Sequence, residues 1–157
     1  MRNIRITAVG LVLVLSLASM SFKCGGGGCA DNSPLCSSAR AADAIAKSIG
    51  EANTVKRELA RQGKITSAEE LKLTQQLLRL NTADKAFVRR LKALNAAPDT
   101  ATKQQLTSLF NEVTAALDDL NSTGVMPLGD QGARDRLTAI ITAIRASVQI
   151  IQPFLNS

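Results

Sequence analysis

Three cysteines are the residues best suited to covalent chemistry in this 157-residue chain, and all of them lie near its start. Cys24, Cys29 and Cys36 follow an apolar run, and four glycines separate the first two. A thiol can be acylated, oxidised to a disulfide or used as a metal ligand. Three cysteines in a chain without histidine cannot complete the usual set of four zinc ligands, so no metal site is predicted.

The number of cysteines suggests how they are used. An odd number in an exported protein leaves one thiol unpaired, bonded to another chain or modified. We therefore interpret Cys24 as a lipidation candidate, and Cys29 and Cys36 as the candidate disulfide. A cysteine directly after an apolar region resembles the layout of bacterial lipoproteins, with Lys23 in place of the usual small residue. The alternative bridge, Cys24 to Cys29, would constrain a glycine run that has no core to support.

The residues before the cysteines have the pattern of a secretory signal. Arg2 and Arg5 precede residues 6–22, which contain no charged side chain, and residues 19–21 fit the small-x-small pattern of a cleavage site. As a helix, the run would be about 25 Å long. This is slightly short of a bilayer core of about 30 Å, so an uncleaved anchor is the alternative. In both cases the arginines predict that the rest of the chain leaves the cytoplasm.

We expect three parts in the chain. Residues 1–21 form a signal peptide or membrane anchor, residues 22–36 form a flexible tether rich in cysteine and glycine, and residues 37–157 form a helical domain. From residue 35 onward apolar residues recur at steps of three and four, which predicts four amphipathic helices and no strand.

Capping residues indicate where the first two helices begin and end. Ser33 before Pro34 predicts the start of the first helix, and Gly63 predicts its end. Ser67 and Glu70 have the spacing of a capping box, which predicts the start of the second helix. The expected buried side of the second helix consists of Leu71, Leu77, Leu78, Phe87, Val88, Leu91 and Leu94.

Proline and glycine indicate the remaining boundaries. Pro98 ends the second helix, and Pro153 kinks or ends the fourth. The expected ranges are 99 or 100 to 121–124 for the third helix and about 133 to 151 for the fourth. Four such helices with mostly short links predict an all-α, antiparallel four-helix bundle. The alternative is a longer two-helix hairpin that completes its core by dimerising.

The charge of the chain, +6 overall, is unevenly distributed. Residues 40–103 contain thirteen basic and seven acidic residues, whereas residues 104–157 contain three basic and five acidic ones. Two basic groups share helix faces, so we predict a basic surface that consists of Arg57, Arg61, Lys64, Lys85, Arg89 and Lys92. Such a surface either contacts an anionic partner or is an ordinary solvated face.

Several kinds of chemistry are not expected. Without histidine, the commonest general base and the serine and cysteine triads are ruled out. Glu112 and Asp119 lie seven residues apart on one helix face, which is only a weak pattern for a cation site. We predict no catalytic residue and no cofactor. Nucleic acid is not an expected partner either, because the chain is exported and contains no Trp or Tyr for base stacking.

These observations favour an exported, membrane-tethered bacterial envelope protein, located in the periplasm or at the cell surface, with a non-enzymatic binding or structural role. The expected partner is another protein or a second copy of the chain. An anionic membrane surface or an acidic envelope polymer is a further candidate. The alternative function is a soluble periplasmic or secreted carrier of a small ligand or a metal ion.

Overall fold

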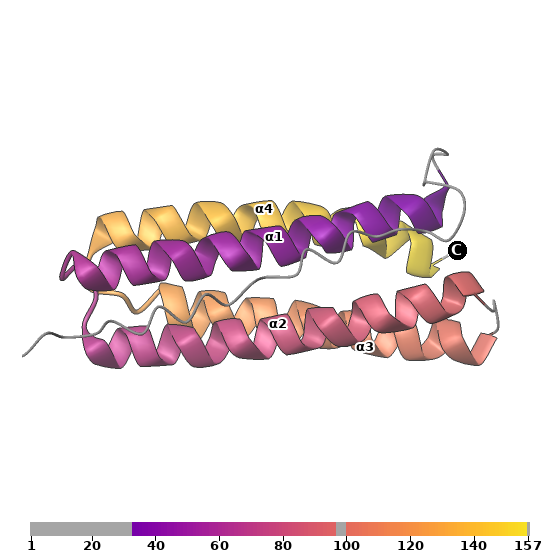
Figure 1. The fold of residues 1–157 in the computed structure, drawn as a ribbon, viewed down its shortest axis with the longest axis horizontal. Helices are drawn as coiled ribbons and strands as arrows, with labels where there is room; N and C mark the ends of the chain where they lie inside the picture. Colours follow the sequence, from indigo (N-terminus) through magenta and orange to yellow (C-terminus); the bar gives the residue numbers. More distant parts are fainter. Residues whose placement is uncertain (1–32, 97–99, 157) are drawn as a thin grey trace, which may run out of the picture.

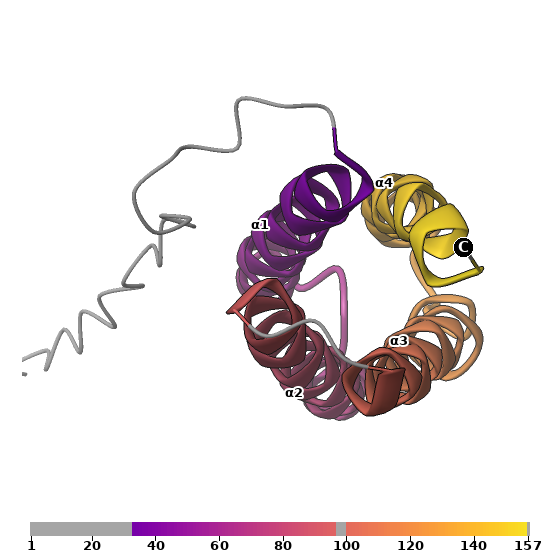
Figure 2. The same cartoon turned by 90° about the vertical axis from the view of Figure 1, so that its right-hand side faces the viewer.

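A computed structural model of the protein describes residues 33–96 and 100–156. Its helices are α1 (Pro34–Arg61), α2 (Ser67–Ala96), α3 (Thr100–Asp119), the π-helix η1 (Leu120–Val125) and α4 (Gln131–Asn156), and the described residues contain no strand. The four long helices pack side by side around one core (Figures 1 and 2). α1 packs against α2 and α4, and α2 packs against α3. The prediction of an all-helical fold is confirmed.

The predicted start and end of α1 are confirmed. The Ser33 side chain accepts a hydrogen bond of 3.2 Å from the Cys36 amide, and Pro34 occupies the first turn. At the other end the Lys64 amide donates to the Leu59 carbonyl at 2.9 Å, and Gly63 has a φ of 67°. This Schellman ending requires a left-handed residue, which glycine provides at low cost. Residues 34–36, assigned above to the tether, therefore form the first turn of α1.

The capping box of α2 lies one residue earlier than predicted. The Thr66 side chain accepts from the Glu69 amide at 3.2 Å, and the Glu69 carboxylate accepts from the Thr66 amide at 2.7 Å. The same carboxylate accepts from the Gly129 amide at 2.9 Å, which ties the start of α2 to the segment before α4. These backbone hydrogen bonds lower the pKa of Glu69. Ser67 and Glu70 matched the spacing, but Thr66 and Glu69 make the bonds.

The buried side of α2 was predicted incorrectly at two positions. Leu71 and Leu78 are 60% and 63% exposed, while Leu73 and Leu80 are fully buried. Helical residues advance by about 100° each, so Leu71 and Leu73 point in nearly opposite directions. The buried positions follow one another in alternating steps of four and three, namely Leu73, Leu77, Leu80, Asp84, Phe87, Leu91 and Leu94.

The third helix continues beyond its predicted end at residues 121–124. η1 extends it to Val125, and the Met126 amide donates to the Asn121 carbonyl at 2.9 Å, the five-residue spacing of a π-helix. Gly124 is buried, and a Cβ atom at this position would lie 3.3 Å from side-chain atoms of Leu73 and Leu120. The glycine therefore allows η1 to approach α2 closely, rather than ending the helix.

α4 also extends beyond its predicted end. It begins at Gln131 and passes through Pro153 to Asn156. Proline lacks an amide hydrogen and crowds the preceding turn, which bends a helix without always ending it. The last turn of α4 leaves the line of the rest of the helix (Figure 1). Leu155, beyond the proline, is buried in the core.

Candidate functional site

The outer side of α2 carries the most distinctive surface of the described residues. Leu71, Leu78, Lys85 and Lys92 follow one another at intervals of seven, and Arg89 lies one turn beyond Lys85. Residues seven apart share a helix face. All five side chains are exposed. We call these five residues the α2 stripe.

The α2 stripe has an apolar half and a basic half. Its two leucines are the most exposed of the large apolar side chains, and they lie in the first half of α2. The three basic residues follow in the second half. Within the described residues, neither Lys85 nor Arg89 forms an ion pair. The stripe therefore offers both leucine side chains and cationic groups to an external partner.

The second predicted basic group lies around the end of α1, and two of its members have internal contacts. Lys64 forms an ion pair of 3.3 Å with Asp130, and Arg57 donates to the Asn53 carbonyl at 3.3 Å. Arg61 is exposed in the last turn of α1. Asp130 partly neutralises the charge of Lys64, so the three charges of this group are not all available to an external partner.

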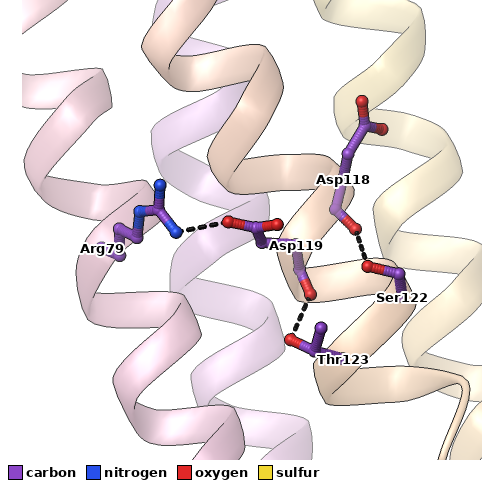
Figure 3. Close-up of polar contacts among 5 residues, drawn as sticks. All are labelled: Arg79, Asp118, Asp119, Ser122 and Thr123. Atoms are coloured by element: carbon purple, nitrogen blue, oxygen red, sulfur yellow. Dashed lines mark hydrogen bonds and ion pairs between the residues drawn. The ribbon is translucent and has the colours of Figure 1, made fainter.

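The acidic pair at the end of α3 does not converge on one site. Asp119 pairs with Arg79 of α2, and Asp118 pairs with Arg145 of α4 at 3.0 Å. Figure 3 shows the two carboxylates pointing apart, while the Ser122 and Thr123 hydroxyls donate to backbone carbonyls one turn earlier at 2.8 Å. These ion pairs join α3 to both neighbouring helices.

The weak cation site suggested by Glu112 and Asp119 is not assembled. Asp119 is engaged by Arg79, and Glu112 is exposed. Among residues 33–96 and 100–156, no group of three or more Cys, Asp or Glu side chains could hold a metal ion. Of the cysteines, only Cys36 is described, and it is half-buried in the first turn of α1. The lipidation candidate Cys24 and the disulfide candidate Cys29 lie outside the described residues.

Two charged side chains occupy buried positions that sequence reasoning did not identify. Lys56 lies in the buried stripe of α1 between Ala52 and Leu59, and its ammonium donates to the Thr74 hydroxyl at 2.6 Å. Burial lowers the pKa of Lys56, an effect that the nearby Glu70 carboxylate opposes. The burial of Lys56 could have been predicted from the spacing of the apolar residues in α1, because Lys56 lies four residues after Ala52 and three before Leu59.

Asp84 is the second such residue, and it is 2% exposed. Its Oδ1 atom is buried without a hydrogen-bond partner among the described residues. Burial raises the pKa of Asp84 from 3.8 to about 7, with a further contribution from Asp43 of α1, while Lys85 opposes the rise. Asp84 again occupies a step of the apolar repeat, between Leu80 and Phe87.

By length and composition, α4 is the one helix in the described part of the chain that could cross a membrane. A core helix of a bundle has the same properties, and the buried residues of α4 recur along its length. Comparison of the chain with known protein families, with curated proteins and with solved structures gives no match.

Proposed function

We propose that the protein is an exported, membrane-tethered helical bundle without catalytic activity, and that the α2 stripe binds an anionic membrane surface. The observation that carries this proposal is the combination of two exposed leucines with three basic residues on one face of α2. Apolar side chains can enter the boundary between headgroups and acyl chains, while lysine and arginine attract anionic headgroups.

The export part of the proposal is supported by the sequence before the bundle. Arg2 and Arg5 precede the uncharged residues 6–22, and Cys24 follows as the lipidation candidate. A diacylglyceryl group on Cys24 would contain two acyl chains, which are sufficient for stable attachment to the membrane. The α2 stripe would add a second contact that sets the orientation of the bundle on the surface. An uncleaved anchor at residues 1–21 would hold the stripe near the membrane in the same way.

We further propose that the four helices form the antiparallel bundle predicted above, preceded by the signal or anchor segment and the tether. Contacts between neighbouring helices support this arrangement. Glu58 of α1 pairs with Arg136 of α4, and Lys64, just after α1, pairs with Asp130, just before α4. Moving toward the C-terminus of α1 therefore corresponds to moving toward the N-terminus of α4, as expected for antiparallel helices.

The position of the basic half supports contact with the membrane that holds the tether. The Asp43 charge acts on Asp84, so the first part of α1 lies beside the second part of α2. The chain enters the bundle at the start of α1. Lys85, Arg89 and Lys92 therefore lie in the half of the bundle that the tether enters.

Vesicle flotation tests the proposed contact. We expect the purified protein to bind vesicles that contain phosphatidylglycerol more tightly than phosphatidylcholine vesicles, and this difference in affinity to disappear as salt is raised. A basic residue near an anionic surface contributes about 1 kcal/mol, so the triple variant Lys85→Gln, Arg89→Gln, Lys92→Gln should bind roughly a hundredfold more weakly. Leu71→Ser with Leu78→Ser should also weaken binding.

Matched variants on other surfaces provide the controls. Met126 and Ile150 are each 55% exposed, so Met126→Ser with Ile150→Ser removes two comparable apolar side chains outside the stripe. Arg61→Gln with Lys64→Gln removes charge from the second basic group. Both control variants should retain binding. Equal loss in stripe and control variants, or no binding to anionic vesicles by the parent protein, would contradict the proposed contact.

A further inference from the structure

Asp84 stands alone as a charged residue in the buried repeat of α2. The residues one turn before and after it, Leu80 and Phe87, are buried apolar side chains. The Phe87 ring contacts Phe110, so α3 packs against α2 next to Asp84. The Asp84 side chain is 2% exposed, and its Oδ1 has no hydrogen-bond partner among the described residues. A carboxylate in such a layer lacks the solvation that an ionised group requires.

The charged groups around Asp84 do not provide a salt bridge. From α1, Asp43 faces it and is itself paired with Lys47 at 2.8 Å. On α2, Lys85 is adjacent in sequence but its side chain is exposed. On α3, the charged residue at this level is Glu112, two positions after Phe110, and it is also exposed.

The fourth helix contributes no compensating charge either. α4 packs against α1 and α3, not against α2, and it carries no charged residue after Arg145, which is paired with Asp118. Lys85 lowers the pKa of Asp84, but this effect is smaller than that of burial.

We propose that Asp84 is a protonation switch within the bundle: the neutral acid is compatible with the closed core, and loss of its proton loosens the half of the bundle formed by the start of α1, the end of α2 and the start of α3. The α2 stripe extends into this half, because Lys85 follows Asp84 directly and Arg89 and Lys92 lie beyond it. Loosening of this half would therefore change the arrangement of the basic residues of the stripe. The proposed switch does not depend on what the stripe binds.

The sign of the pH dependence follows from the direction of the pKa change. The folded protein holds the Asp84 proton up to about pH 7, whereas an unfolded aspartic acid loses it near 3.8. The contribution of the Asp84 proton to the free energy of unfolding is therefore fully present below about pH 3.8, and it is lost as the pH rises through about 7. In this window the equilibrium constant for opening should rise by up to about tenfold per pH unit.

The test uses the purified full chain in a non-ionic detergent, with helix unfolding followed by circular dichroism in urea between pH 5 and pH 8.5. We expect the unfolding constant of the parent, relative to that of Asp84→Asn, to rise by roughly fiftyfold to a hundredfold over this range, with most of the rise below about pH 7. Asp84→Leu, which fills the same position with an apolar side chain, should match Asp84→Asn in its pH dependence. Asp135→Asn, at an exposed position of α4, should follow the parent.

Two site-specific measurements complete the test. The carboxyl carbon of Asp84 should titrate near pH 7 by NMR, and titration near pH 4 would overturn the proposal. At pH 8, amides in the second half of α2 should exchange faster in the parent than in Asp84→Asn, with smaller differences in the second half of α1. Parallel pH profiles for the parent and both Asp84 variants, or equal exchange throughout the bundle, would also overturn it.

Discussion

Leu73→Ala is expected to lower the free energy of unfolding by about 2–5 kcal/mol, whereas Leu71→Ala should change it by about 0.5 kcal/mol or less. The two substitutions remove the same atoms from positions two residues apart on α2. Leu73 is 0% exposed and packs in the core, while Leu71 is 60% exposed. The difference follows from the cavity left behind at the buried position. Urea unfolding followed by circular dichroism measures both values.

A second pair of leucines on α2 repeats the experiment one heptad later. Leu80 is 0% exposed and Leu78 is 63% exposed, so Leu80→Ala should again be the costly substitution and Leu78→Ala the tolerated one. Similar decreases in the free energy of unfolding at the four positions, or larger decreases at Leu71 and Leu78, would mean that α2 is rotated about its axis relative to the arrangement described above. The α2 stripe would then not exist as a surface.

Phe87→Ala is expected to cost about 3–5 kcal/mol, the range for removing a buried aromatic ring. Phe87 is 1% exposed, and its ring centroid lies 5.8 Å from that of Phe110, with the planes tilted by 52°. The ring fills space in the core between α2 and α3, and an alanine side chain would leave a cavity there. Phe87→Leu should cost less than the alanine variant, because it retains much of the volume and apolar surface.

A double-mutant cycle separates the ring contact from general packing. Because the two phenylalanines touch, Phe87→Ala and Phe110→Ala together should cost about 0.5–1.5 kcal/mol less than the sum of the two single variants. Strict additivity in equilibrium unfolding would show that the rings do not interact. In that case the contact would not hold α3 against α2.

The number of helices and most of their boundaries could be predicted because the signals are local. The cap at Ser33 and the left-handed Gly63 each depend on a few neighbouring residues, and both predictions are confirmed. The errors arose where a second element decides the outcome. Gly124 is a close-packing residue because α2 lies against it, and Pro153 stays within α4 while Leu155 beyond it packs in the core.

Only the basic half of the candidate site could be predicted from the sequence. The basic residues of the α2 stripe were predicted as a surface, but Leu71 and Leu78 were assigned to the core because they are apolar. The same reasoning missed Asp84, since a charged residue in a helix is normally expected on the solvated side. Two seven-residue repeats, one through Leu73 and Leu80 and the other through Leu77 and Leu91, place Leu71 and Leu78 outside the core. The second repeat places Asp84 within the core.

Protease accessibility in spheroplasts, followed by the intact mass of the protein, tests most directly whether this bundle works outside the cytoplasmic membrane and attached to it. We predict that added protease degrades the bundle without lysis and that the protein partitions with membranes. Its mass should correspond to a chain that starts at Cys24 and carries a diacylglyceryl group, or to one that keeps residues 1–21 as an anchor. A full-length, unmodified chain in the soluble fraction, protected from protease until the cells are lysed, would contradict the account.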